Sequence, residues 1–148
     1  MKVQLASIAT REPGADFERV ARIYLQRLPT YIPTESNIFG SETAFFDAAN
    51  RIRARTSPVV VLLDSRGKLF SSENFATWIG QQRDSGVQNL IFAVGPADGW
   101  SDRARAQSHM LLSLGPMTLP HELARVVLAE QIYRAFTILA GHPYHSGH

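Results

Sequence analysis

The stretch "VVVLLDS", residues 59–65, decides the fold class of this chain. It is short, rich in β-branched residues and apolar on both faces, which is the pattern of a strand buried inside a parallel sheet. A second run of this kind, "LIFAVG", occupies residues 90–95. Between them, residues 72–83 have a helical pattern, and the connection is long enough for the crossover that parallel strands require. The sequence therefore predicts an α/β domain with a mostly parallel sheet.

The flanking segments continue this alternation of strands and helices. Apolar and β-branched runs predict further strands at residues 3–9, 36–39 and 111–114. Apolar residues at helical spacing, with serine capping residues before two of the segments, predict helices at 17–28, 41–55 and 101–110. The chain contains no repeat and no low-complexity linker. We therefore expect one domain spanning residues 1–148.

The last predicted helix, residues 122–140, is apolar almost all round. A helix of this kind is buried, either in its own chain or against a partner chain. Pro120 suits the entry to the helix, Gly141 suits the position after its end, and Pro143 prevents its continuation. Glu130 and Arg134 are spaced for a salt bridge on this helix, and charges on so buried a surface should be paired or functional.

Composition narrows the classes of partner and compartment. The formal net charge is +2, which permits an RNA partner without arguing for one. Cysteine is absent, so neither a disulfide nor a thiolate nucleophile is possible, and a reducing compartment suits the chain. No apolar stretch approaches the roughly 18 residues of a membrane span, and "MKVQLASIAT" is typical of a strand rather than a signal peptide. We expect a cytoplasmic protein that binds neither membrane nor DNA.

Two glycine-containing bends are the candidate ligand loops. The chain has no P-loop, no nucleophile elbow and no GxGxxG fingerprint. "VGPADGW", residues 94–100, follows a buried strand, and ligands of open α/β sheets bind outside the carboxyl ends of strands. "LSLGPMTLPHE", residues 112–122, offers backbone groups that suit a flat polar ring such as a purine. Taken alone, each bend is more often a simple connection between elements.

The tail "GHPYHSGH", residues 141–148, crowds three histidines and a tyrosine behind the last helix. Regularly spaced histidines can ligate a metal, but the tail has no carboxylate nearby in sequence to complete such a site. We therefore expect no metal and favour contact with a substrate. His121, by contrast, is of a kind that is more often a hydrogen-bonded structural histidine than a catalyst.

The segment "MTLPHELARVVLAEQIYRAFTILAGHPYH", residues 117–145, closely resembles the C-terminal signature of the ribosomal RNA large subunit methyltransferase H family. "MKVQLASIAT", "YLQRLP", "VVVLLDSRGK" and "FAVGPADGWS" resemble further segments of that family. The family consists of small SPOUT-class enzymes that methylate N3 of a pseudouridine in 23S rRNA. The resemblance implies a SPOUT-type, mostly parallel sheet with helices on both faces and a C-terminal trefoil knot. It also implies a homodimer, S-adenosylmethionine (SAM) bound in the knot, and 23S rRNA within the ribosome as partner.

The resemblance also assigns site residues. The positions that match the cofactor-binding residues of the family are Leu63, Gly95, Leu114, Gly115, Pro116, Met117, Thr118 and Leu119. The family usually has a GGPEG-type loop, where this chain has "GPADG" with Pro96 and Asp98. It also commonly has a basic residue after HPYH, where this chain has Ser146. Proline removes a backbone donor, whereas Asp98 keeps the acidic group.

The same resemblance gives the tail a catalytic role. We expect Tyr144 and His145 to position the target base or remove its proton beside the cofactor, across a dimer interface, with His142 orienting them. Arginines and lysines of the first helix and the loops would contact RNA phosphates. Two alternatives remain open, namely an RNA- or nucleotide-binding module without transfer activity, and a metal-dependent hydrolase that uses the tail histidines.

Overall fold

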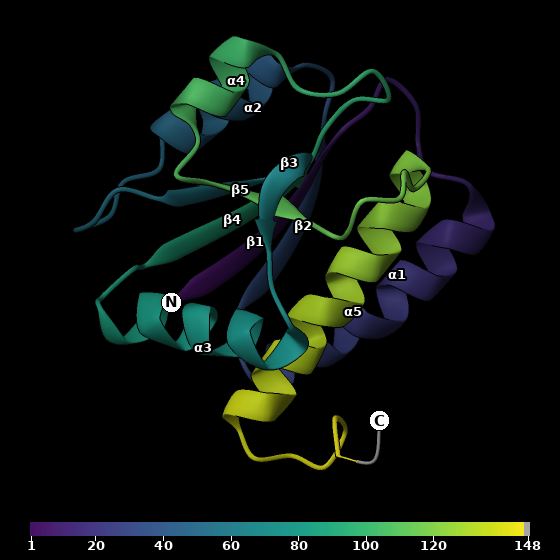
Figure 1. Ribbon diagram of the computed structural model, residues 1–148. Coiled ribbons are helices and arrows are strands. Elements are labelled where there is room, and N and C mark those ends of the chain that lie inside the picture. The colour runs from purple at the N-terminus through teal and green to yellow at the C-terminus, as the bar shows by residue number, and fades with distance from the viewer. Residues whose placement is uncertain (147–148) are drawn as a thin grey trace.

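The computed structural model describes residues 1–146, and in this part of the chain every strand pairing is parallel (Figure 1). The five-stranded sheet has the order β2-β1-β4-β3-β5. The elements are β1 (Lys2–Ile8), α1 (Ala15–Arg27), the 3-10 turn η1 (Leu28–Thr30), β2 (Thr34–Phe39), α2 (Glu42–Asn50), β3 (Val59–Leu69), α3 (Ser72–Asp84), β4 (Asn89–Val94), α4 (Asp102–Gln107), β5 (Met110–Ser113) and α5 (His121–Leu139). The predicted α/β class is confirmed.

Helices cover both faces of the sheet, and the two apolar runs lie at its centre. On β4, Leu90 and Phe92 face the core formed with α3 and α5, whereas Ile91 and Ala93 face the core formed with α2 and α4. All four side chains are at most 1% exposed, which explains why this strand has no polar face. α1 packs beside α5 on the first face (Figure 1).

Two predicted helices are shorter than expected. The helix predicted at 41–55 ends at Asn50, and residues 51–58 form an irregular connection to β3. The helix predicted at 101–110 ends at Gln107 because the next residues join the sheet. There, His109 donates its backbone N–H to the Val60 carbonyl at 2.8 Å, and its Nδ1 accepts from the Val60 N–H at 2.9 Å. The prediction was wrong here because a backbone pairing between distant residues overrides the local helical pattern.

β3 extends four residues beyond the predicted end, to Leu69, and contacts β5 twice. Leu112 of β5 pairs with Leu63 and again with Lys68 of β3. The second half of β3 approaches β5 so closely that a Cβ on Gly67 would lie 2.4 Å from the Leu111 carbonyl carbon. Glycine is therefore required at this position, since a side chain would collide with backbone.

α5 is largely buried within its own chain, and none of its side chains is fully exposed. It ends as predicted, with Gly141 in the left-handed region at φ 71°. The N–H groups of Gly141 and His142 return to the carbonyls of Ile138 and Thr137, which is the Schellman arrangement. Within residues 1–146, no helix is long and apolar enough to cross a membrane.

Candidate active site

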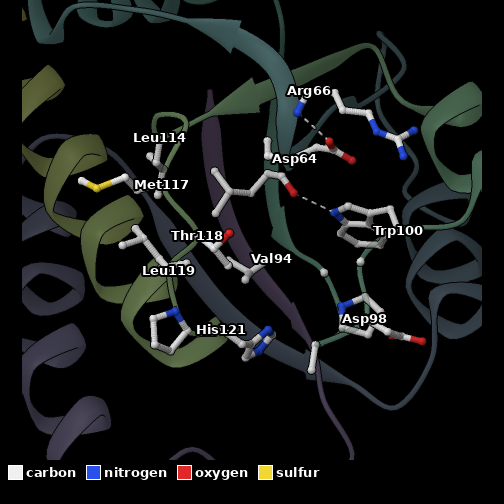
Figure 2. A pocket seen from close by; sticks show the side chains of 18 of the residues that line it. Asp64, Arg66, Val94, Asp98, Trp100, Leu114, Met117, Thr118, Leu119 and His121 are labelled. Carbon is white, nitrogen blue, oxygen red and sulfur yellow. Dashed lines mark hydrogen bonds between the residues drawn. The ribbon is translucent and has the colours of Figure 1, made fainter.

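A cavity of about 720 Å³ lies at the carboxyl ends of the strands. Its walls are the middle of β3, the segments that follow β4 and β5, and the start of α5 (Figure 2). These segments are far apart in sequence, but the carboxyl ends of parallel strands share one edge of the sheet. The volume lies within the range of small-molecule sites.

The structure brings together the residues that the sequence assigned to cofactor binding, with one exception. Those that line the cavity are Leu63, Gly95, Leu114, Gly115, Met117, Thr118 and Leu119. Pro116 is not among the lining residues. Figure 2 shows Leu114, Thr118 and Leu119 on one side of the cavity and Trp100 and Asp98 on the other.

Trp100 fixes the loop after β4, a role that the sequence analysis missed. Its indole Nε1 donates to the Leu63 carbonyl at 3.0 Å, which ties this loop to the end of β3. A Cβ on Gly95 would lie 2.8 Å from the same indole, so glycine is needed where the loop passes Trp100. Trp100 is 4% exposed, and a tryptophan five residues after a strand-end glycine was the available signal for it.

Asp64 places a carboxylate at the cavity wall, again beyond what the sequence predicted. It accepts hydrogen bonds from the Arg66 backbone N–H at 2.8 Å and from Arg105 Nε at 2.8 Å. Burial opposes ionisation, but these hydrogen bonds outweigh it and hold the pKa of Asp64 below its ordinary value. The carboxylate is therefore ionised near neutral pH and ties α4 to the end of β3.

The loop after β5 is bent at Gly115, whose φ is 132°. Ser113 Oγ accepts from the Gly115 N–H at 3.1 Å and lies 3.1 Å from the Gly115 carbonyl oxygen, to which it donates. Met117 is 83% exposed on this loop. The Ser113 side chain thus holds the backbone of the bend in place. The exposed Met117 gives the bend an uncovered apolar surface.

The tail lies at the opposite end of α5 from the cavity (Figure 1). Tyr144 donates its hydroxyl to Glu130 at 3.1 Å, and its ring packs edge-on against Tyr133 with centroids 4.8 Å apart. His121 and Ala124 are the described α5 residues at the cavity; at about 1.5 Å per residue, Glu130 is about 14 Å along the helix from the first and about 9 Å from the second. The tail residues therefore do not line the cavity of their own chain.

Tyr144 and His145 are held by charged side chains. Burial raises the pKa of Tyr144 to about 12, and the Glu130 carboxylate adds to the shift. The two ring nitrogens of His145 lie 2.9 Å from Arg134 and 2.8 Å from Glu73. His142 accepts the Tyr144 backbone N–H at its Nδ1, 3.1 Å away, so it shapes the turn that carries the other two.

Although the tail has no carboxylate nearby in sequence, folding brings Glu73 and Glu130 to it. In the part of the chain that the structure describes, however, no three histidine or acidic side chains are grouped to hold a metal ion. His148, the third histidine of the tail, lies outside the described residues.

Known proteins resemble this chain over nearly its whole length. A family profile described as "Predicted SPOUT methyltransferase" matches residues 1–145. The ribosomal RNA large subunit methyltransferase H of Koribacter versatilis (strain Ellin345) is 49% identical over 148 residues, covering 100% of both chains. The protein of the same name from Rhizobium meliloti (strain 1021) is 45% identical and covers 98% of this chain and 99% of the relative. The chain belongs to the ribosomal RNA large subunit methyltransferase H family, within the SPOUT methyltransferases.

A solved methyltransferase structure has a similar fold. The SpoU methyltransferase AviRb from Streptomyces viridochromogenes, in complex with the cofactor AdoMet, matches with a TM-score of 0.52 and 12% identity. The match covers 96% of this chain and 58% of AviRb, so this chain spans little more than half of that structure.

The departure from the family's glycine loop leaves its turn intact. The carbonyl of Pro96 accepts the Gly99 N–H at 2.8 Å, and Gly99 has a φ of 87°. The turn uses the carbonyl of Pro96 and not the N–H that proline lacks. Asp98, in place of the family's glutamate, lines the cavity and is exposed.

Proposed function

We propose that residues 1–148 form a single SAM-dependent methyltransferase domain that acts on N3 of a pseudouridine in 23S rRNA within the ribosome. It would act in the cytoplasm as a homodimer. The observation that carries the proposal is that three separate segments line one cavity of about 720 Å³: Leu63 of β3, Gly95 after β4, and Leu114, Gly115, Met117, Thr118 and Leu119 after β5.

The residues of the cavity fit SAM. The apolar side chains of Leu114 and Leu119 and the backbone of the 114–119 bend suit the flat adenine, which needs both apolar contact and hydrogen bonds at its edge. The carboxyl groups of Asp64 and Asp98 suit a ligand with cationic sulfonium and ammonium groups. When bound, SAM supplies an electrophilic methyl group.

Several features support the C-terminal knot. A residue in a sheet pairs with at most one strand on each of its sides, so the two partners of Leu112 support a path in which β5 runs between the two halves of β3. The close approach of Gly67 to Leu111 marks where the chain crosses over (β3 curves across β5 in Figure 1). The chain that follows β5 would then emerge from this loop and form the cavity wall.

The homodimer is supported by apolar surface that one chain leaves uncovered. On α1, Phe17, Val20 and Ile23 are 37%, 41% and 42% exposed. On α5, Leu123 and Val127 are half-buried along the stripe that its own chain does not cover. Adjoining apolar surface on two neighbouring helices is typical of an interface between subunits.

The position of the tail supports the same assembly. Since Tyr144 and His145 contact α5 about 14 to 20 Å along the helix from His121, they cannot serve the cavity of their own chain in this arrangement. An antiparallel pair of α5 helices related by a twofold axis would bring each tail to the other chain's cavity. There Tyr144, which is protonated at neutral pH because its pKa is about 12, would donate a hydrogen bond to the base.

For RNA contact, the loops at the cavity are better placed than α1. On α1, Arg19 pairs with Asp16 and Arg22 with Glu18. Exposed Arg11 and Arg66, by contrast, line cavities at the carboxyl edge of the sheet. Free guanidinium groups at this edge would hold the phosphates around the target nucleotide.

The decisive experiment is transfer of a tritiated methyl group from SAM to ribosomes that lack the modification, followed by mapping of the labelled nucleotide. We expect label on N3 of one pseudouridine of 23S rRNA. SAM binding by calorimetry without any transfer would instead support the RNA- or nucleotide-binding module. Activity that needs a metal and not SAM would support a hydrolase.

A further inference from the structure

His121 stands between two cavities. It lines the large cavity assigned to SAM, as do Asp98 and Thr118 (Figure 2). It also lines a second, smaller cavity of about 30 Å³ between the start of α5 and the ends of β1 and β2. One imidazole therefore forms part of the wall of both spaces.

The smaller cavity holds two buried polar atoms that lack partners within residues 1–146. These are Ser7 Oγ and Arg125 Nε, on side chains that are 3% and 5% exposed. The other two nitrogens of Arg125 are satisfied, by Glu18 at 2.9 Å and by Ser36 at 2.9 Å. Buried polar atoms in native proteins are paired with protein or with ordered water, and this space suits about one water molecule.

His121 itself has the properties of a proton acceptor. Among the residues that the structure describes, neither of its ring nitrogens has a hydrogen-bond partner. It is the first residue of α5, so the backbone holds it at the rim shared by the two cavities. A neutral imidazole with both nitrogens available can take a proton on one and pass a proton on from the other.

The charged groups around the imidazole come from five segments. They are Glu122 and Arg125 of α5, Arg11 of the β1–α1 loop, Asp64 and Arg66 of β3, Asp98 of the β4–α4 loop, and Arg105 of α4. Glu122 is engaged by the Gly14 N–H at 2.8 Å, and Asp64 is engaged by Arg105. Glu122 and Asp64 thus already accept hydrogen bonds, and Asp98 is exposed to solvent. Among the described residues, the imidazole of His121 is therefore the proton acceptor at this wall that is neither hydrogen-bonded nor exposed.

We propose that His121 is the general base of the methyl transfer and that the smaller cavity carries the proton away. This inference rests on the proposed function. One ring nitrogen takes the proton from N3 of the target base, and the electron pair of the N3–H bond forms the new N3–CH₃ bond. The C–S bond of SAM breaks, and its electron pair neutralises the sulfonium. The imidazolium then releases a proton from its other nitrogen to water held by Ser7 and Arg125.

The assignment divides the work between His121 and the tail. Tyr144 is protonated and therefore a donor, and His145 is engaged on both ring nitrogens by Arg134 and Glu73. The partner's tail would orient and enclose the base, whereas His121 would remove its proton. The orienting role of the tail is one of the roles expected from the sequence. The role of general base, in contrast, is assigned to His121 and no longer to the tail.

The test uses His121→Asn and His121→Ala in the full-length protein, with His109→Asn as a matched loss of one imidazole at the other edge of the sheet. Affinity for SAM is measured by calorimetry, and methyl transfer at saturating SAM is measured between pH 5.5 and 9. We expect both His121 variants to bind SAM within about threefold of the parent. Their transfer rate should fall about 10²- to 10⁴-fold, as for loss of a general base. His109→Asn should retain both properties.

Two further readouts separate a base from a structural residue. The parent should lose activity on the acid side of this pH range, where protonation blocks a base, and the His121 variants should lack this acid limb. Added imidazole should restore part of the rate of His121→Ala. A variant that keeps the parental rate or the acid limb overturns the inference. A parent that binds SAM but methylates no ribosome overturns the proposed function itself.

Discussion

The cavity at one end of α5 and the tail at the other are built in different ways. The cavity loops are held by buried and backbone groups, such as Trp100 against Leu63 and the Ser113 hydroxyl against Gly115. The tail is held by side chains of α3 and α5, through part-buried contacts with Glu130 and Arg134 and an exposed contact with Glu73. The cavity is therefore formed within one chain. The tail, in contrast, is held through contacts with side chains of two helices, and the proposed assembly would replace these with contacts in the partner chain.

The contrast shows how the parts of one site can be divided between chains. The family signature places "LPH" and "HPYH" only a helix apart in sequence. That helix is straight and 19 residues long, so it separates the two motifs by most of the domain. In the proposed homodimer, the second copy of the chain would supply one of these two motifs to the site.

The largest expected effect comes from breaking the tail alone. Tyr144→Ala together with His145→Ala removes the groups that would enclose the target base, while leaving every residue of the cavity in place. We expect methyl transfer to fall at least about 10²-fold and SAM affinity to stay within about threefold. Full transfer activity in this double variant would remove the tail from the mechanism.

A mixed dimer sharpens this test. The tail-defective chain is co-purified with a chain that carries Gly95→Val, which damages the cavity. If the site is shared, each mixed dimer holds one intact cavity facing one intact tail, and activity returns to about half of the parental value per dimer. Mixed dimers that form but stay inactive would contradict a site shared between chains.

Gly95→Val measured by itself tests the cavity half of the comparison. A Cβ at this position would meet the Trp100 indole at 2.8 Å, and overpacking of this kind costs about 1–3 kcal/mol. We expect the dissociation constant for SAM to rise about tenfold to a hundredfold. Gly40→Ala is the matched control, because a Cβ there has no atom within 4 Å. Calorimetry that shows equal affinities for the two variants would argue against a cofactor seated at Gly95.

The central fold and the cavity loops were predictable from the sequence because their causes are local. The apolar runs before Leu63 and Gly95 can form only buried strands, and the glycines after them mark the loops. The polar second half of β3, in contrast, follows no apolar pattern. It becomes a strand because β5 presents an unpaired edge to Lys68 and Leu69.

What could not be predicted depends on contacts between distant residues. Trp100 and Asp64 become part of the site only through partners 37 and 41 residues away, respectively. His121 was judged a structural histidine from its surroundings in sequence, yet in the fold its ring has no partner among the described residues. The position of the tail depends on the length of α5 and on Glu73, which belongs to another helix.

Removing positive charge at the cavity edge should have a moderate effect that depends on salt. Arg11→Gln and Arg66→Gln each remove a proposed phosphate contact, so each should lower the slope of log affinity for ribosomes against log salt by roughly 0.7 to 0.9. Arg53→Gln and Arg55→Gln are the controls, because these exposed arginines lie before β3, at the opposite edge of the sheet. Equal losses from both pairs, measured by filter binding, would mean that only total charge matters.

The smallest expected effect concerns the contact of the tail with its own chain. The His145 imidazole lowers the pKa of Glu73, so the contact is favoured where Glu73 is ionised and is lost as pH falls through that lowered pKa. Glu73→Gln should therefore speed amide hydrogen exchange at residues 142–146 near neutral pH, without changing the thermal unfolding midpoint or SAM affinity. Glu73 is exposed, and exposed ion pairs contribute little to global stability. A large drop in the unfolding midpoint would mean instead that the tail is an integral part of its own subunit, which would weaken the case for its transfer to the partner.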